Sequence, residues 1–256
     1  MLKVFVGWDP DEVAAYQVCV ASLAGRSSLR LEVQPLLQPH LRALGLYWRP
    51  QERRGGQLWD SISGAPMATD FALTRFLVPH LAGYGGWALF CDCDFLWRAD
   101  LAELLALADP RHAVMLVKHD HKPPEERKMD GRAQLPYRRK NWSSLVLWNC
   151  CHKANRALTP ALVSAWPGRN LHGFAWLDDH LIGALPEAWN WLEGWSDPAI
   201  DPKAVHFTRG TPDMPGYQAV PYADDWRAVL AEVNGGPKVP QPRKANPAAQ
   251  SKAGSD

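Results

Sequence analysis

The stretch WALFCDCDFLW, residues 87–97, places two carboxylates at the end of an apolar run. The residues before Asp92 have the composition of a buried strand, and Asp92 and Asp94 follow it directly. Charged side chains are rarely buried unless they are paired or coordinate a metal ion. With one residue between them, an extended backbone points both carboxylates to the same side. The stretch therefore predicts a core strand that ends in an acidic pair.

The segments around this strand alternate between strand and helix patterns. Strand patterns cover 3–6, 31–37, 87–92, 113–117, 142–149 and 204–207, and helix patterns cover 9–25, 67–81, a segment from Asp100, 154–165 and 174–184. Residues 39–66 are rich in Gly, Arg and Pro, so we expect a loop there with at most a short helix. Strands that alternate with helices predict an α/β fold, in which helices cover both faces of a mostly parallel sheet.

The first helix has start and stop signals in the sequence. Asp9 is the expected N-cap, Pro10 suits the first helical position, and Glu12 completes a capping box. Gly25 is expected to end the helix.

The acidic pair predicts a metal site. In an open α/β sheet, ligands bind beyond the carboxyl ends of the strands, where Asp92 and Asp94 are expected. Paired carboxylates suit Mg²⁺ or Mn²⁺, which are often shared with substrate phosphates. The spacing alone also fits a turn cap followed by a solvated carboxylate. A phosphatase with an aspartyl nucleophile is disfavoured because Leu96 stands where that motif has Thr or Val, which leaves nucleotide-sugar-dependent glycosyl transfer.

Composition argues against several other classes of protein. The net charge is +1 over 256 residues, so no global field favours nucleic acid. The apolar runs are far shorter than the ~20 residues of a membrane span, and the amino terminus lacks a signal-peptide layout. The odd number of cysteines, mostly in apolar segments, is typical of reduced thiols in the cytoplasm.

The end of the chain differs in composition from the rest. From Gly235 onward it has almost no apolar residues, so we expect one domain over 1–234 and a disordered tail over 235–256. The few positive charges of this tail support at most a weak association with a membrane surface.

Several motifs, in order, resemble glycosyltransferase family 8, which has the GT-A fold. The resemblance covers most of residues 2–217. It rests on VFVGWDPDEVAAYQVCVASL (4–23), FALTRFLVPHL (71–81), LFCDCDFLWRADL (89–101), NWSSLVLWN (141–149), FAWLDDHLIGALPEAWNW (174–191) and AVHFTRGTPDMPGY (204–217). It implies a Rossmann-like, mixed but mostly parallel sheet flanked by helices in a single domain.

The resemblance also implies site residues. Asp92, Asp94 and His206 match the metal ligands, and the nitrogen ligand favours Mn²⁺ over Mg²⁺. Asp178 and Asp179 fall on the family's sugar-contacting acidic pair and are the implied catalytic residues. Positions that match nucleotide or donor contacts are Gly7, Asp9, Arg75, Asp92, Asn141, Ser143 and Gly210.

The chain departs from the family pattern at two places. Residues 142–144, Trp-Ser-Ser, replace an Asn-Ala-Gly run, and Asn141 comes one position early. The lysine that supports the diphosphate in the family is absent after Gly210, which leaves Arg209, Lys203 or the charged loop 118–140 as substitutes. That loop is either a lid over the donor or a plain solvated excursion.

The expected activity is metal-dependent transfer of a sugar from a nucleotide sugar, a UDP-sugar, to a carbohydrate or other hydroxyl acceptor with retention of configuration. Two alternatives stay open: a nucleotidyltransferase or phosphohydrolase that uses the same metal, and a non-catalytic carbohydrate-binding homologue with the GT-A fold. The tryptophans that could stack on an acceptor sugar, or else belong to the core, are Trp176, Trp189, Trp191 and Trp195.

Overall fold

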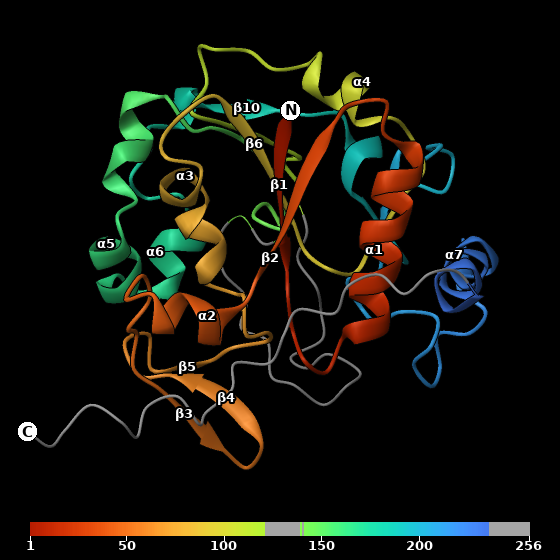
Figure 1. The fold of residues 1–256 in the computed structure, drawn as a ribbon, viewed down its shortest axis with the longest axis horizontal. Coiled ribbons are helices and arrows are strands. Elements are labelled where there is room, and N and C mark those ends of the chain that lie inside the picture. The colour runs from red at the N-terminus through yellow and green to blue at the C-terminus, as the bar shows by residue number, and fades with distance from the viewer. Residues whose placement is uncertain (121–138, 140, 236–256) are drawn as a thin grey trace, which may run out of the picture.

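A six-stranded sheet forms the centre of the computed structural model, which describes residues 1–120, 139 and 141–235 (Figure 1). Its order is β10 (Ile182–Ala184), β8 (Val114–Leu116), β9 (Leu145–Asn149), β6 (Trp87–Cys91), β1 (Leu2–Gly7) and β2 (Leu31–Leu36). Only β9 runs antiparallel to its neighbours within this sheet, and the other neighbouring pairs are parallel. The predicted α/β fold with a mixed, mostly parallel sheet in a single domain is confirmed.

Helices lie on both sides of this sheet (Figure 1). On one side are α1 (Val13–Arg26) and α7 (Ala223–Gly235), and on the other are α3 (Val78–Leu81), α5 (Pro160–Ala165) and α6 (Gly168–His172). The remaining short helices are α2 (Gln38–Ala43), α4 (Leu101–Leu105), η1 (Thr74–Leu77), η2 (Lys153–Ala157), η3 (Asp179–Leu181) and η4 (Glu187–Asn190). The core between these layers is closed by large side chains such as Phe90 and Trp148, both fully buried.

A second, three-stranded sheet consists of β11 (Trp191–Leu192), β12 (Ala204–His206) and β7 (Phe95–Trp97). Strand β12 is antiparallel to β7, with His206 opposite Phe95. Because β7 begins directly after the acidic pair, this register brings the end of β12 beside Asp94. The small sheet therefore joins a late segment of the chain to the carboxyl end of β6.

The segment 39–66, for which we expected a loop with at most a short helix, contains most of the short helix α2 and also a three-stranded sheet of β3 (Gln51–Arg54), β4 (Gln57–Asp60) and β5 (Ala65–Pro66). The prediction missed this sheet because the glycines were taken only as loop residues. Gly55 and Gly56 have φ angles of 55° and 85°, and positive φ at both central positions is the requirement of a tight hairpin turn.

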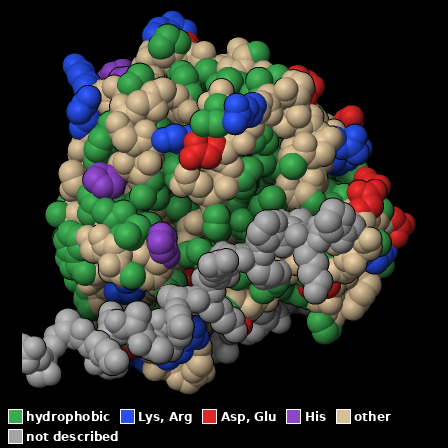
Figure 2. All heavy atoms as spheres, viewed as in Figure 1, with side chains coloured by type: hydrophobic (Ala, Val, Ile, Leu, Met, Phe, Trp, Pro, Cys, Tyr) green, Lys and Arg blue, Asp and Glu red, His purple; other side chains and the backbone are tan. Residues whose placement is uncertain are grey.

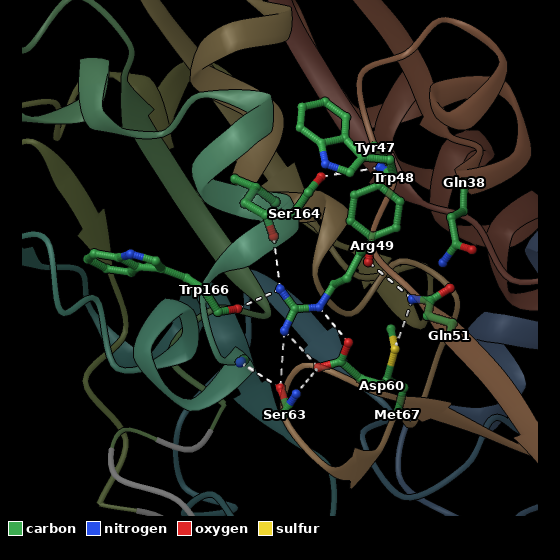
Figure 3. Close-up of polar contacts among 12 residues, drawn as sticks. Gln38, Tyr47, Trp48, Arg49, Gln51, Asp60, Ser63, Met67, Ser164 and Trp166 are labelled. Atoms are coloured by element: carbon green, nitrogen blue, oxygen red, sulfur yellow. Dashed lines mark hydrogen bonds and ion pairs between the residues drawn. The ribbon is translucent and has the colours of Figure 1, made fainter.

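A buried ion pair attaches this small sheet to the rest of the protein (Figure 3). The guanidinium of Arg49 donates to both carboxylate oxygens of Asp60, at 2.5 and 2.7 Å, and both residues are almost fully buried. The same guanidinium donates to the carbonyls of Val163 and Trp166, in and directly after α5. Ser63 completes the cluster through hydrogen bonds with Arg49, Asp60 and the N–H of Gly168.

The start of α1 differs from the prediction. The helix begins at Val13, with Glu12 at the N-cap position, and continues through Arg26 past Gly25. Asp9 is not the cap: its two carboxylate oxygens accept from the backbone N–H groups of Asp11 and Asp70, each at 3.0 Å. The carboxylate instead joins the loop after β1 to the loop before η1.

Three predicted helices are shorter or absent. Residues 174–184 form turns, η3 and strand β10, because the apolar residues from Ile182 pair with β8 rather than with a helical face. The segment 154–165 is divided into η2 and α5, with Pro160 at the first turn of α5, where its missing N–H costs nothing. Within 67–81 only η1 and α3 are helical.

The surface and the end of the described chain add two findings. On the face shown in Figure 2, Lys and Arg side chains are intermixed with Asp and Glu rather than gathered in one basic patch. Among the described helices, none has the length and apolar character needed to cross a membrane. Helix α7 ends at Gly235. The rest of the predicted tail, 236–256, and most of the lid candidate, 121–138 and 140, lie outside the described residues.

Gly7, at the end of β1, is fixed by packing. A Cβ there would lie 2.5 Å from the ring of Phe71, which is itself almost fully buried. We expect Gly7→Ala to lower the free energy of unfolding by about 1–3 kcal/mol, as overpacking does. Gly25→Ala is the matched control, because nothing lies within 4 Å of its Cβ position; in a helix it should stabilise by about 0.5–1 kcal/mol. Urea unfolding of both variants measures this, and equal effects would contradict the packing account.

Candidate active site

Asp92, Asp94 and His206 converge beyond the carboxyl end of β6. Each offers a ligand atom, and these atoms lie within 4.8 Å of one another. Nε2 of His206 is 3.3 Å from Oδ1 of Asp94, and the imidazole is buried whereas the two carboxylates are partly exposed. Two carboxylates and one imidazole in this span fit Mn²⁺ or a similar divalent cation. The three residues predicted as metal ligands are thus brought together.

Arg75, from η1, is buried against the same site. Its Nη1 lies 2.7 Å from Oδ1 of Asp92 and donates to the carbonyl of Ser143 at 2.9 Å. The guanidinium also lies over the rings of Phe90 and Phe71, 4.9 and 5.3 Å from their centroids. Its positive charge therefore offsets one of the two carboxylates and holds it in place.

A hollow opens beside Asp94. Its lining comes from the N-cap of α1, the turn between β6 and β7, and the segment after β12: Glu12, Asp94, Phe207, Thr208, Arg209, Gly210, Thr211 and Met214. Sequence reasoning treated Glu12 only as part of a capping box and missed its place here. The signal available in the sequence was its place in the loop between the first strand and the first helix. In the structure its carboxylate accepts from the thiol of Cys93 at 2.9 Å, and burial raises the pKa of that thiol, with Glu12 adding to the effect.

Of the two named substitutes for the missing lysine, Arg209 lines this hollow and Lys203 does not. Lys203 forms an ion pair with Glu103 and lies over the ring of Trp189. Arg209 lies beside Gly194, where a Cβ would come 2.5 Å from its Nη1. Burial raises the pKa of the neighbouring Glu193 carboxyl, and Arg209 partly counteracts that rise.

The segment that replaces Asn-Ala-Gly contacts Arg75 through the carbonyl of Ser143. Oγ of Ser143 is 2.8 Å from Nδ1 of His172, a residue of α6 that sequence reasoning did not single out. Asn141 has a left-handed backbone, with φ of 63°, and its carbonyl accepts from Oγ of Ser144. The indole N–H of Trp142 donates to the carbonyl of His119 at 2.8 Å. This hydrogen bond from its indole ring fixes the side chain of Trp142, and an alanine could not form it.

The acidic pair Asp178 and Asp179 lies outside the three-residue cluster. Both side chains are exposed, Asp178 as the N-cap residue of η3 and Asp179 within it, so the helix predicted to carry them is absent. Asp179 forms an ion pair with Arg139, whose Nη1 also donates to the carbonyl of Gly173 at 2.6 Å. Because Gly173 follows His172, contacts run from Asp179 to the Ser143 side of the site.

Two predicted donor-binding glycines have packing roles in the structure. Gly7 makes room for Phe71, and a Cβ at Gly210 would lie 2.7 Å from the ring of Tyr217. Of the tryptophans considered for acceptor stacking, Trp189 and Trp191 are buried in the core. Trp195 is 36% exposed, and Trp176 is half-buried and stacks on Trp148.

No family model matches the chain. Protein CDI of Arabidopsis thaliana is 47% identical over 237 residues, which cover 91% of this chain and 87% of that protein.

Solved structures share the fold at low sequence identity. The bifunctional glycosyltransferase WbbM superposes with a TM-score of 0.59 and 13% identity over 90% of this chain, which spans 49% of WbbM. The galactosyltransferase LgtC, solved with donor and acceptor sugar analogues, gives a TM-score of 0.56 and 12% identity over 92% of this chain and 98% of its own. The fold is therefore that of the GT-A glycosyltransferases.

Proposed function

The chain belongs to the family of Arabidopsis thaliana Protein CDI, and from its fold and site we propose that it is a metal-dependent glycosyltransferase. The donor is a nucleotide sugar, a UDP-sugar by resemblance to family 8, and the acceptor is a hydroxyl of a carbohydrate or other molecule. The observation that carries this proposal is the convergence of Asp92, Asp94 and His206 at the end of β6 in a GT-A fold. That is the edge of an α/β sheet where nucleotide ligands bind.

Asp92, Asp94 and His206 would hold the cation, with Mn²⁺ favoured by the imidazole ligand. When bound, such a cation neutralises the negative charge that grows on a departing diphosphate. Arg75 fixes Asp92 through its 2.7 Å contact, so this carboxylate needs no reorganisation when a donor arrives.

Arg209 is our choice for the residue that takes over from the missing lysine. It lines the same hollow as Asp94, whereas Lys203 is held by Glu103. A guanidinium can donate two parallel hydrogen bonds to phosphate oxygens, so it can replace an ammonium at such a position.

The remaining donor contacts are proposed by motif position. Asn141 and Ser143 face the sugar side, and Gly7, Asp9 and Gly210 adjoin the nucleotide side. The amide nitrogen of Asn141 is buried and has no hydrogen-bond acceptor among the described residues. A donor-sugar hydroxyl would satisfy it, which supports a ligand contact there.

Measurement of nucleoside diphosphate release tests the proposed function. The purified chain is incubated with a panel of nucleotide sugars and hydroxyl acceptors, with Mn²⁺ or with EDTA. We expect UDP and a glycosylated acceptor only with Mn²⁺. Release of pyrophosphate or phosphate would instead indicate nucleotidyl transfer or phosphate hydrolysis. Metal-dependent donor binding without turnover would indicate a non-catalytic carbohydrate-binding protein.

We expect retention, an α-linked product from an α-linked donor, in which the leaving phosphate accepts the acceptor proton. Asp179 is proposed to stabilise the cation-like sugar, so Asp179→Asn should lower kcat at least tenfold, about 1.4 kcal/mol, with little change in donor affinity. Asp178→Asn is the matched control and should act mainly on donor affinity. Product NMR and steady-state kinetics check both statements, and a β-linked product would contradict the assignment.

A further inference from the structure

His206 has a second buried polar neighbour that no motif identified. Its Nδ1 lies 2.9 Å from Oδ1 of Asn190, at the end of η4. Asn190 is fully buried, and its amide nitrogen donates to Oγ of Ser144 at 2.9 Å. Ser144 in turn donates to the backbone carbonyl of Asn141 at 2.7 Å. Four residues from three segments of the chain thus form one line of hydrogen bonds.

The direction of this line is set at the Asn141 end. A backbone carbonyl can only accept, so the single hydroxyl proton of Ser144 is committed to it. Oγ of Ser144 can then only accept a hydrogen bond from Asn190, so the NH₂ group of Asn190 must be the donor. The same NH₂ lies 3.5 Å from the Asn141 carbonyl, so an amide rotated by 180° would place oxygen against two acceptors. The amide oxygen of Asn190 therefore faces His206.

An amide oxygen opposite Nδ1 requires a proton on Nδ1. In a neutral imidazole this leaves Nε2 with its lone pair, and Nε2 is the nitrogen that lies 3.3 Å from Asp94. The ring of Phe95 stacks on the imidazole at 4.5 Å and 16°, which holds the plane of the ring. The imidazole is therefore presented with a lone pair on the same side as the carboxylates.

We propose that Asn190 is a positioning residue that fixes the Nδ1–H tautomer of His206, so that Nε2 is ready to ligate the cation. The inference rests on the metal site of the proposed function. Groups that hold the second nitrogen of a ligating histidine fix its tautomer and raise its basicity, and their loss typically weakens metal binding about 10–100-fold.

The first experiment reads the tautomer directly in the metal-free full chain. Nitrogen-15 NMR of labelled histidines, well above the ordinary imidazole pKa of about 6.5, separates protonated from unprotonated ring nitrogens. The His206→Gln variant identifies which signal belongs to His206. We expect a protonated Nδ1 and an unprotonated Nε2. A neutral ring protonated on Nε2, or one protonated on both nitrogens at that pH, would overturn the inference.

Variants of Asn190 then connect the tautomer to the metal. Asn190→Leu keeps the volume but removes the acceptor; we expect it to release the tautomer bias and weaken Mn²⁺ binding about 10–100-fold by titration calorimetry. Asn190→Asp keeps an acceptor for Nδ1–H and should restore both. Equal losses in the two variants would mean that Asn190 acts only through packing.

A variant more distant from the metal guards against misfolding of Asn190→Leu. Ser144→Ala removes the anchor of the amide while Asn190 keeps its oxygen, so we expect a mixture of His206 tautomers in the NMR spectrum. An unchanged His206 tautomer in that variant would contradict the proposed line of hydrogen bonds from Ser144 through Asn190 to His206. The two proposals also fail separately: absence of Mn²⁺ binding with the expected tautomer rejects the metal site, and Mn²⁺ binding with the opposite tautomer rejects the role of Asn190.

Discussion

Asp94→Ala is expected to abolish the Mn²⁺ dependence of UDP binding while the protein remains folded. Asp94 provides one of two carboxylates in the cluster and lies against the buried His206. Loss of a ligand itself should exceed the 10–100-fold loss typical of its supporting residues, so we expect at least about 100-fold weaker UDP binding in the presence of Mn²⁺. Titration calorimetry with UDP, in Mn²⁺ and in EDTA, measures the effect.

Asp94 is the better choice for this test than Asp92. Removal of Asp92 would leave the buried guanidinium of Arg75 without its carboxylate, and an uncompensated buried charge destabilises the fold. Asp201→Ala is the matched control, because that carboxylate is 90% exposed. It should leave UDP binding unchanged. If the unmodified protein binds UDP equally well in Mn²⁺ and EDTA, the proposed metal site is wrong.

Arg49→Met is expected to lower the free energy of unfolding by roughly 3–5 kcal/mol, the usual cost of removing one partner of a buried ion pair. The substitution leaves the Asp60 carboxylate buried and removes donors from the carbonyls of Val163 and Trp166. Arg54→Met is the control, because its pair with Glu52 is exposed, and it should cost at most about 1 kcal/mol. Urea unfolding measures both.

The same ion pair should give a dependence on pH. Burial alone would raise the pKa of Asp60, but hydrogen bonds from Arg49 and Ser63 outweigh it and lower the pKa. A carboxyl with a lowered pKa stabilises the fold above its unfolded pKa of about 3.9, and this contribution is lost as the pH falls through the folded value. The difference between Arg49→Met and the unmodified protein should therefore be largest near neutral pH and shrink in acid. A difference that grows on acidification would contradict this account.

The central part of the site could be predicted from the sequence because its signals are local. An apolar run followed by Asp92 and Asp94 identifies both the strand and the acidic pair. His206 was identified by the resemblance of the segment 204–217 to family 8. The pairing of β12 with β7 is a tertiary event, so periodicity carries no sign that His206 lies opposite Phe95. Asn190 could not be identified for the same reason: tertiary packing brings it to its partners Ser144 and His206, which are 46 and 16 residues away in sequence.

The errors have physical causes of the same kind. The apolar residues near Ile182 fit the spacing of a helical face. In the structure this segment pairs as strand β10 with the edge of β8 instead, where its backbone forms hydrogen bonds. Asp9 is a residue type that commonly caps helices. Its carboxylate oxygens instead accept hydrogen bonds from the backbone N–H groups of Asp11 and Asp70. The hairpin at Gly55 and Gly56, by contrast, carried a local signal that was overlooked.

The pairing of β7 with β12 also bears on how the protein is made. The two strands that meet at the cluster are Phe95–Trp97 and Ala204–His206, so most of the chain must leave the ribosome before the third ligand exists. A nascent chain that ends near residue 200 carries both aspartates but no His206. The pairing of β7 with β12 closes a long loop, and a long loop slows the formation of such a contact more than it lowers its stability. Tight cation binding would then arise only after β12 has been synthesised and has paired with β7, and a shorter nascent chain would compete poorly for divalent cations.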